Sequence, residues 1–251
     1  MHIDLTGKTV LVTGASRGIG AAIATALAES GATVAVHYSA SPDEAAQVAA
    51  ACGPDARTFA ADLADPAACQ RLWTEVVARY GRIDVLVNNA GVATAVDDPS
   101  IDRWLEIWNR TLDVNLRATA LLCRLATDHF AAMGGGRIIN ISSRAAFRGD
   151  QPDYIAYAAS KGGMVALTRS IARGFGKQGI VAFNVAPGFT RTAMAQDFID
   201  QYGEDYATSD IALTRLTEPN DIAPTIVFLA SGLADHATGA TIDINAGSYV
   251  H

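Results

Sequence analysis

Short β-rich segments alternate with helix-like segments along the chain, and this alternation restricts the possible fold more than any other feature. The segments with strand character are 8–13, 33–37, 57–61, 83–88, 137–142, 180–186 and 241–245. The segments with helical character are 19–30, 42–51, 66–80, two helices within 101–133, a long helix that ends near 177, and 221–231. Strands that alternate with helices form a parallel sheet covered on both faces. We therefore predict one α/β domain over residues 1–251, a doubly wound parallel sheet of about seven strands with helices on both faces.

Composition and charge exclude several classes of protein. Half of the 251 residues are hydrophobic, so the chain can bury a large core. The net charge of −7 argues against binding to nucleic acid or to an anionic membrane, because both require a basic face. The sequence has neither an apolar signal region nor the roughly 18 apolar residues of a membrane span. Cys52, Cys69 and Cys123 lack metal-ligand spacing and indicate reduced thiols, so we expect a cytoplasmic protein without a metal site.

A glycine-rich turn joins the first strand to the first helix in Thr13-Gly-Ala-Ser-Arg-Gly-Ile-Gly20. Gly14, Gly18 and Gly20 allow the backbone to turn tightly and to approach a ligand, and the helix amino terminus offers N–H groups to a pyrophosphate. The usual spacing is Gly-x-Gly-x-x-Gly, so a plain glycine-rich turn is the alternative. The strand before the turn and the helix after it favour a Rossmann-type dinucleotide site.

The second strand ends without the acid that usually holds the adenosine ribose of NAD. Tyr38 and Ser39 occupy that place, and Arg17 stands within the glycine turn. An arginine without a competing carboxylate suits a 2′-phosphate. We therefore expect NADP(H) to be favoured over NAD(H), with a solvated Arg17 as the alternative.

A tyrosine and a lysine stand one helical turn apart in Tyr157-Ala-Ala-Ser-Lys161, so a helix places both on one face. A phenol with a pKa of about 10 is a poor acid or base at neutral pH. A nearby ammonium favours the phenolate and lowers that pKa. The pair is therefore suited to moving a proton to or from an alcohol or ketone oxygen, although an ordinary exposed helix can carry the same two residues.

Together these motifs resemble the short-chain dehydrogenase/reductase family. The matching motifs are Thr13-Gly-x-x-x-Gly-x-Gly20, Asn88-Asn-Ala-Gly91, Ser143 with Tyr157-x-x-x-Lys161, Pro187-Gly188, Asp221-Ile-Ala, Phe228-Leu-Ala-Ser and Thr238-Gly239. The resemblance extends from about Gly7 to Gly247 and is greatest to the branch that contains 3-oxoacyl-carrier-protein reductases. It implies an enzyme that moves a hydride between NADP(H) and a carbonyl or secondary alcohol.

The resemblance also implies a role for each matching residue. Tyr157 would be the general acid or base, Lys161 would lower its pKa, and Ser143 would bind the substrate oxygen, while Asn115 would hold a water of the proton relay. The implied cofactor contacts are Gly14, Ser16, Arg17, Gly18, Ile19, Gly20, Tyr38, Ser39, Asp62, Leu63, Asn89, Ala90, Gly91, Tyr157, Lys161, Pro187, Gly188, Phe189, Thr190 and Thr192. The expected substrate contacts are Ser143, Arg144, Arg148, Gln151, Tyr154 and Phe189, with Phe147 beside them.

Simpler explanations exist for several of these residues. Asn115 is alternatively a polar core residue, Asn88 and Asn89 close the fourth strand, and Asp62 caps the following helix. Arg144 and Arg148 suit a carboxylate or phosphate, or are simply solvated.

The sequence departs from the family pattern at several places. Tyr157 follows Ser143 by 14 positions, one more than is usual, so either the loop has an extra residue or Ser142 shares the role; we favour Ser143. Tyr154 is a second tyrosine nearby, but it lacks a lysine four positions later, so we expect it at the rim of the pocket and not as the acid. Asn245-Ala-Gly247 replaces the usual Asp-Gly-Gly, so we expect the C-terminal turn to differ from that of the family. The polar segment 190–215 interrupts the alternation and is expected to form a substrate lid.

The remaining expectations concern substrate and partners. A small free ketone or alcohol is preferred, because Gly134-Gly135-Gly136 and Gln178-Gly179 occupy places where the carrier-protein reductases carry basic residues. A 3-oxoacyl-carrier-protein reductase, with acyl carrier protein as partner, is the alternative, and a non-catalytic cofactor-binding protein is a remote one. The resemblance implies a homotetramer, with one interface formed by the helices around 112–132 and 155–177 and another by the last helix and strand.

Overall fold

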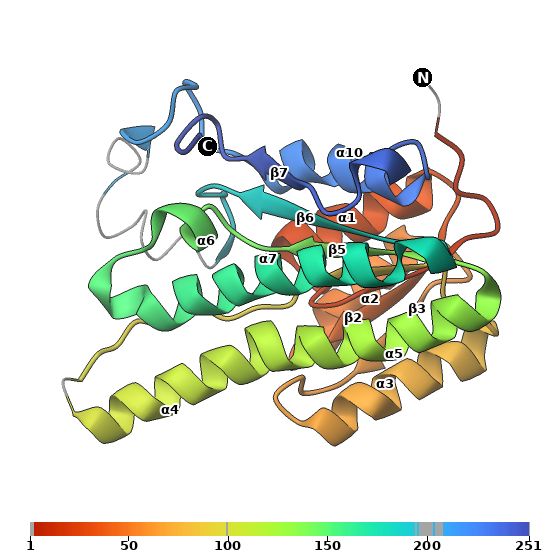
Figure 1. Cartoon of the computed structure of the whole chain (residues 1–251), viewed down its shortest axis with the longest axis horizontal. Helices are drawn as coiled ribbons and strands as arrows, with labels where there is room; N and C mark the ends of the chain where they lie inside the picture. Colours follow the sequence, from red (N-terminus) through yellow and green to blue (C-terminus); the bar gives the residue numbers. More distant parts are fainter. Residues whose placement is uncertain (1–2, 99, 194, 196–202, 204–207, 251) are drawn as a thin grey trace.

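One parallel sheet runs through the molecule (Figure 1). The structure is a computed structural model that describes residues 3–98, 100–193, 195, 203 and 208–250. Its seven strands lie in the order β3-β2-β1-β4-β5-β6-β7, and all neighbouring pairs are parallel. The strands are β1 (Thr9–Val12), β2 (Thr33–Tyr38), β3 (Arg57–Ala60), β4 (Val85–Asn88), β5 (Gly136–Ile141), β6 (Ile180–Pro187) and β7 (Thr241–Ile244). The predicted fold class is therefore confirmed.

The strand order reverses between β1 and β4, which lie side by side although two strands separate them in sequence. In open α/β sheets, ligands bind outside the carboxyl ends of the strands at such a point. The turn after β1 and the loop after β4 are the segments that carry the glycine and asparagine motifs. The topology thus brings two motifs that are far apart in sequence to one edge of the sheet.

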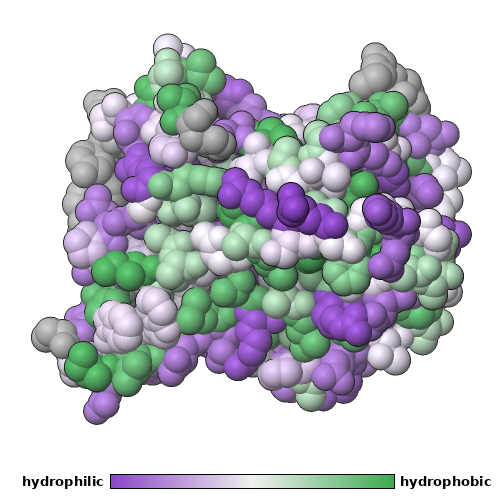
Figure 2. All heavy atoms as spheres, in the orientation of Figure 1, coloured by the Kyte–Doolittle hydropathy of each residue, from purple (hydrophilic) through white to green (hydrophobic). Residues whose placement is uncertain are grey.

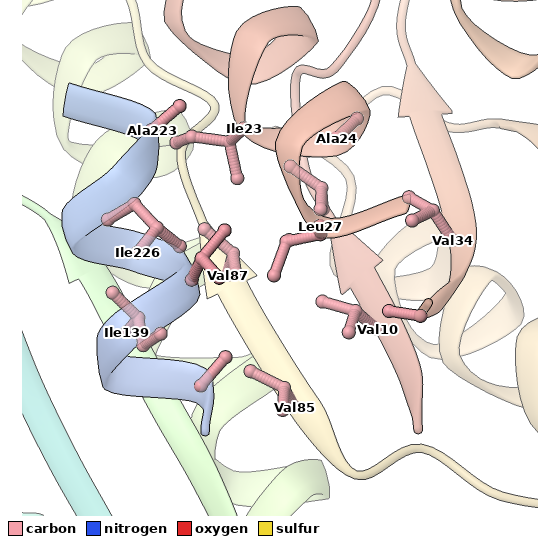
Figure 3. Close-up of a cluster of buried hydrophobic side chains, with 14 of the residues drawn as sticks. Val10, Ile23, Ala24, Leu27, Val34, Val85, Val87, Ile139, Ala223 and Ile226 are labelled. Atoms are coloured by element: carbon pink, nitrogen blue, oxygen red, sulfur yellow. The ribbon is translucent and has the colours of Figure 1, made fainter. Parts of the chain in front are cut away.

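Helices cover both faces of the sheet (Figure 1). On one face, α1 (Gly18–Glu29), α2 (Pro42–Ala51) and α10 (Pro219–Ala230) pack over the sheet, and Figure 3 shows Leu27 and Ile226 above Val85 and Val87. On the other face lie α3 (Pro66–Tyr80), α5 (Ala118–Met133) and α7 (Ile155–Phe175). Since both faces are covered, buried residues do not alternate with exposed ones along the central strands, as in the fully buried β1.

A continuous helical rod leads into α5. It begins as α4 (Ile101–Leu112), passes through a π-helical turn called η1 (Asp113–Arg117), and continues as α5. The two helices predicted within 101–133 are confirmed, whereas the π-helical turn was not predicted. Gly134, at φ 82°, ends α5 in the left-handed conformation that glycine tolerates best.

Shorter elements complete the part of the chain that is described. They are α6 (Ala145–Arg148), η2 (Pro152–Tyr154), η3 (Gly176–Gln178) and η4 (Asp235–Ala237). The expected lid lies partly outside the described residues, which omit 194, 196–202 and 204–207. At its ends, Thr190 pairs with Thr217, and the Arg191 amide donates to the Thr217 carbonyl. None of the described helices is both long and apolar enough for a membrane span.

Candidate active site

The glycine turn after β1 fits closely against the loop after β4. A Cβ atom on Gly14 would lie 2.8 Å from the Ala90 Cα, and one on Gly20 would lie 2.2 Å from the Gly14 carbonyl oxygen. Gly14 also has a φ of +62°, which a side chain disfavours. Only glycine therefore allows this close approach of the two backbones.

Two side chains hold these loops together. The Asn89 Nδ2 donates to the carbonyl oxygens of Thr13 at 2.9 Å and Gly14 at 3.0 Å. The Thr13 Oγ1 accepts from the amides of Asn89 at 3.0 Å and Ala90 at 3.1 Å. Asn89 thus makes the side-chain-to-backbone bonds that the simpler explanation expects. Asn88 instead donates to the Asn140 Oδ1 at 2.8 Å and so joins β4 to β5.

The start of α1 suits a bound pyrophosphate. Helix α1 begins at Gly18, and the side chain of its N-cap residue, Arg17, does not cap the N–H groups of the first turn. A helix amino terminus of this kind attracts an anion. A Cβ on Gly18 would lie 3.3 Å from the Thr192 Cγ2, so the segment after β6 borders the same turn. The narrow glycine cradle fits a dinucleotide, which Gly14, Ser16, Gly18, Ile19 and Gly20 would hold.

The residues expected around the adenosine lie at the ends of β2 and β3. Arg17 and Ser39 are exposed, whereas Tyr38 is half-buried and Leu63 is buried. Both carboxylate oxygens of Asp62 accept bonds from Arg110, at 3.1 and 3.2 Å.

Asp62 is not the cap of α3. It accepts a bond from the Ala64 amide, and this bond, followed by the Arg110 guanidinium, holds the pKa of its carboxyl below the usual range. The residue that caps α3 is Asp65, which accepts from the Ala67 amide at 2.8 Å. The simpler explanation for Asp62 is therefore wrong.

Tyr157 and Lys161 lie on the same face of α7, with the Lys161 Nζ 5.7 Å from the Tyr157 ring centroid. Lys161 is buried, which lowers its pKa to about 8, and its Nζ donates to the Ile141 carbonyl at 2.7 Å. Burial raises the pKa of Tyr157 and outweighs the opposing effect of a hydrogen bond with Ser143. The expectation that the Tyr157 pKa is lowered is thus corrected, because desolvation dominates and the ammonium is bonded to a carbonyl. The phenol keeps its proton at neutral pH, as a general acid requires.

Two neighbouring serines after β5 have different partners. The Ser143 Oγ accepts from the Ala145 amide at 3.1 Å and is hydrogen-bonded to Tyr157. The Ser142 Oγ donates to the Val185 carbonyl at 3.2 Å and so fastens the end of β5 to β6. The structure therefore brings Ser143, rather than Ser142, to the phenol.

Asn115 lies within the π-helical turn and is fully buried. Its Oδ1 accepts from the Val92 amide at 2.8 Å, and its Nδ2 donates to the Val92 carbonyl and to the Ser160 Oγ at 2.9 and 3.0 Å. A Cβ on Gly91 would lie 3.3 Å from the Asn115 Oδ1 and 3.4 Å from the Lys161 Nζ. The two residues therefore border one narrow space beside Gly91.

Ser160 was not singled out from the sequence. Besides accepting from Asn115, its Oγ donates to the Tyr157 carbonyl at 2.7 Å. It therefore links the asparagine to the backbone of the tyrosine. The available signal was a hydroxyl directly before Lys161, on a turn of α7 where the neighbouring residues are alanines.

The expected substrate wall is partly tied down by ion pairs. Arg144 and Arg148 both bond to the Asp210 carboxylate, Arg144 at 3.0 Å. Phe147 stacks on Tyr249, with ring centroids 6.0 Å apart. The two arginines thus connect α6 to Asp210, which lies within the expected lid, so simple solvation does not describe them.

The other predicted contacts lie around the ends of β5 and β6. Gln151 is exposed, and Tyr154, Gly188 and Phe189 are half-buried. Thr190 is buried, and its Oγ1 donates to the Gly188 carbonyl at 3.1 Å. The described residues of the predicted set therefore gather at the carboxyl edge of the sheet.

A buried histidine on β2 was also missed. The His37 Nδ1 accepts from the Gly14 amide at 3.0 Å, and its Nε2 lies 3.1 Å from the Ala61 carbonyl oxygen. A histidine among the valines and alanine of this strand was the only signal in the sequence.

Known proteins resemble this chain over nearly its full length. A family model described as Enoyl-(Acyl carrier protein) reductase matches residues 14–249. The chain is 39% identical to the 3-oxoacyl-[acyl-carrier-protein] reductase FabG of Staphylococcus aureus strain Mu50 over 246 residues, which are 97% of this chain and 98% of that protein. It is 40% identical over 248 residues to the D-threitol dehydrogenase of Mycolicibacterium smegmatis, covering 97% and 93%.

A solved structure is also similar to this chain in three dimensions. The chain aligns with an NAD(P)-dependent gluconate 5-dehydrogenase from Beutenbergia cavernae, solved with NADP at low occupancy, with a TM-score of 0.90. The two proteins are 35% identical, and the alignment covers 99% of each chain.

Proposed function

Since the chain belongs to the short-chain dehydrogenase/reductase family and is an NAD(P)-dependent oxidoreductase of CH–OH or C=O groups, we propose that it uses NADP(H) and a Ser143, Tyr157, Lys161 and Asn115 tetrad. The observation that carries this proposal is the meeting of Tyr157, Lys161 and Ser143 beside the glycine cradle.

In the direction of reduction, the side chains bind and protonate the substrate oxygen. When bound, the cofactor supplies the hydride. Ser143 donates a hydrogen bond to the carbonyl oxygen, and Tyr157 transfers its proton to that oxygen. Burial favours the protonated phenol, whereas the Lys161 ammonium stabilises the phenolate that forms when the proton leaves.

Asn115 supports the return of the proton through its main chain. Its side-chain amide is engaged by Val92 and Ser160. Its carbonyl accepts from the Thr119 hydroxyl at 2.8 Å, and a carbonyl oxygen has a second lone pair for a water. We propose that this water passes a proton towards Lys161.

The preference for NADP(H) rests on Arg17. Among the described residues, its exposed side chain has no hydrogen bond or ion pair, and no acid occupies positions 38 or 39. The guanidinium is therefore available for a 2′-phosphate, to which it can donate two hydrogen bonds. A kcat/KM that is higher with NADPH than with NADH supports this preference, and the reverse order contradicts it.

A small free ketone or alcohol is the proposed substrate, with a thioester on acyl carrier protein as the alternative. Arg137 is engaged by Asp235 at 2.8 and 3.1 Å, and Arg144 and Arg148 by Asp210, so these cations offer little charge to an acidic carrier. A D-threitol dehydrogenase and a gluconate dehydrogenase among the similar proteins also favour a small hydroxylated substrate. The carrier-protein alternative rests on the similarity to FabG and on the exposed Arg173 and Lys177.

The test compares a panel of ketones, polyols and sugar acids with acetoacetyl groups on carrier protein and on a small thiol, each with NADPH or NADP+ and with NADH or NAD+. Turnover of a free ketone or alcohol at a kcat/KM above that of the carrier thioester supports the proposal. A carrier-protein kcat/KM far above the others, falling steeply with salt because charge drives docking, identifies the alternative instead. Absence of turnover across the panel contradicts the assignment as an active reductase.

We also propose a homotetramer, for which the exposed apolar residues of α4 give support. Ile101 is 70% and Leu105 42% exposed, and Trp104 stacks on Trp108 with centroids 5.0 Å apart. Figure 2 shows apolar atoms gathered over the free end of α4 at the lower left. Sedimentation at several protein concentrations tests the proposal, and a monomer at micromolar concentration contradicts it.

A further inference from the structure

His37 contacts two loops through opposite sides of one imidazole ring. Its side chain is buried beneath the carboxyl end of β2, where only 1% of the residue is exposed. The Nδ1 accepts from the Gly14 amide at 3.0 Å, and the Nε2 lies 3.1 Å from the Ala61 carbonyl oxygen. Because an amide can only donate and a carbonyl can only accept, the proton of the neutral ring is on Nε2.

The three segments that meet at His37 are the ones proposed to bind the adenosine half of the cofactor. Gly14 opens the glycine turn, Ala61 directly precedes Asp62 and Leu63, and His37 itself precedes Tyr38. We propose that His37 is a positioning residue that holds these three loops in the geometry needed to bind adenosine and its phosphates. This inference rests on the proposed dinucleotide site and adds to it a residue that does not touch the cofactor.

The backbone around His37 strengthens the same connection. The His37 carbonyl accepts from the Ala15 amide at 2.8 Å, and the Tyr38 carbonyl accepts from the Ala61 amide at 3.0 Å. Both Gly14 and Ala15 therefore donate to His37, one to its side chain and one to its main chain. It follows that the N–H groups presented to a phosphate begin at Ser16.

A neutral imidazole is well suited to this place. Burial lowers the pKa of His37 to about 4, so Nδ1 stays an acceptor near neutral pH. Lysine or arginine would have no acceptor for the Gly14 amide, and an aliphatic residue would have neither group. Asparagine has one acceptor and one donor on a shorter side chain, so it is the conservative replacement.

Two substitutions at this position separate the effect of the hydrogen bonds on cofactor binding from the effect of the volume of the ring. His37→Phe keeps an aromatic ring and removes both hydrogen bonds. The loss of one such bond changes a dissociation constant by about two- to tenfold when the bond supports binding. We expect the Kd of NADPH to rise about tenfold in this variant, with kcat at saturating cofactor nearly unchanged. His37→Asn, which retains a donor and an acceptor, is expected to restore most of the affinity.

His129 provides a matched control within the same chain. Its Nε2 accepts from the Ile83 amide at 3.1 Å, ahead of β4 and at the opposite edge of the sheet from the site. His129→Phe therefore also removes a bond between a histidine and a backbone amide. We expect it to lower the Tm without changing the Kd of the cofactor.

Calorimetric titration with NADPH, 2′,5′-ADP, ADP and nicotinamide mononucleotide measures binding without any turnover. The inference predicts that His37→Phe weakens the three adenosine ligands and leaves the mononucleotide unchanged. It is overturned if His37→Phe binds them like the wild type, or if His129→Phe weakens them equally at an equal loss of Tm. If His37→Phe does not fold, His37→Val, which also lacks both hydrogen-bonding groups, is compared with His37→Asn, and wild-type affinity in His37→Val would also overturn the inference. Failure of the wild type to bind NADPH or NADH contradicts the proposed function instead.

Discussion

The glycine-turn side of the site and the Tyr157 side are built in different ways. Around the turn, the backbone is the proposed binding group, and the side chains of Thr13, Asn89 and His37 hold it in place. Around Tyr157, the side chains are the proposed reacting groups, and helix α7 carries two of them, Tyr157 and Lys161. Changes near the turn should therefore alter cofactor binding, whereas changes near Tyr157 should alter turnover.

The largest effect is expected on the Tyr157 side. Tyr157→Phe keeps the ring and removes the proton, so kcat for reduction should fall by about 10²-fold or more, which is typical when a general acid is lost. Because the cradle is untouched, the Kd of NADPH should stay near that of the wild type. Turnover close to wild type in the variant would contradict the proposed role, and parallel calorimetry checks the binding.

Arg17 is the side chain on the turn side that is proposed to bind the 2′-phosphate of the cofactor. Arg17→Ala removes a charged hydrogen bond to the 2′-phosphate, which corresponds to roughly 10- to 150-fold in binding. The Kd of NADPH should rise by that factor, while the Kd of NADH stays nearly constant. Equal weakening of both cofactors would show that Arg17 supports the turn and does not select the phosphate.

The His37 environment also predicts a change of stability with pH. Its pKa is 6.5 when unfolded and about 4 when folded, so below pH 6.5 the unfolded chain binds more protons and stability falls. Between pH 7 and pH 5 this group should lower the free energy of unfolding by about 2 kcal/mol. Urea unfolding of the wild type and of His37→Asn measures it, since the variant should lose that part of the slope. Identical slopes would contradict the lowered pKa.

A smaller effect on turnover is expected at Ser160. Ser160→Ala removes the link between Asn115 and the Tyr157 carbonyl. The free energy of one neutral hydrogen bond corresponds to a change of about two- to tenfold in a rate or equilibrium constant. We expect kcat to fall by that factor at an unchanged Kd for NADPH, and Ser160→Thr to restore it. Ser170→Ala is the control, because that hydroxyl bonds the Ala166 carbonyl on the same helix without reaching the site. A similar loss of kcat in both alanine variants would indicate a general effect on the helix.

The smallest effect belongs to neither side. Ala246 has a φ of +54°, a left-handed conformation in which a side chain costs energy. Ala246→Gly should raise the free energy of unfolding by about 0.5–1 kcal/mol and leave kcat and Kd unchanged. Thermal unfolding measures the gain, and a lower Tm would show that the alanine methyl group makes a favourable contact.

Local patterns predicted the strands, the glycine turn and the pairing of Tyr157 with Lys161, because each depends on spacing along a short segment. Ser143 and Asn115 were predicted only through the resemblance to the family. Local patterns did not predict the π-helical turn, since a shift of a few helical hydrogen bonds does not change the pattern of hydrophobic residues in the sequence. They also missed the pairing of Arg144 and Arg148 with Asp210, which joins segments more than 60 positions apart. The raised pKa of Tyr157 was missed because burial cannot be read from a motif.

Because of the π-helical turn, the position of Asn115 depends on the number of residues in the rod formed by α4, η1 and α5. A regular α-helix advances about 100° per residue, so removing one residue from 113–117 would convert the rod formed by α4 and α5 into an even helix and turn its two ends relative to each other. All the other side chains of the rod would survive such a deletion, yet Asn115 could not face Val92 while α5 kept its packing on the sheet. Related chains are therefore best compared by counting residues between Trp108 and Cys123, since a match of letters with a different count would not preserve the site.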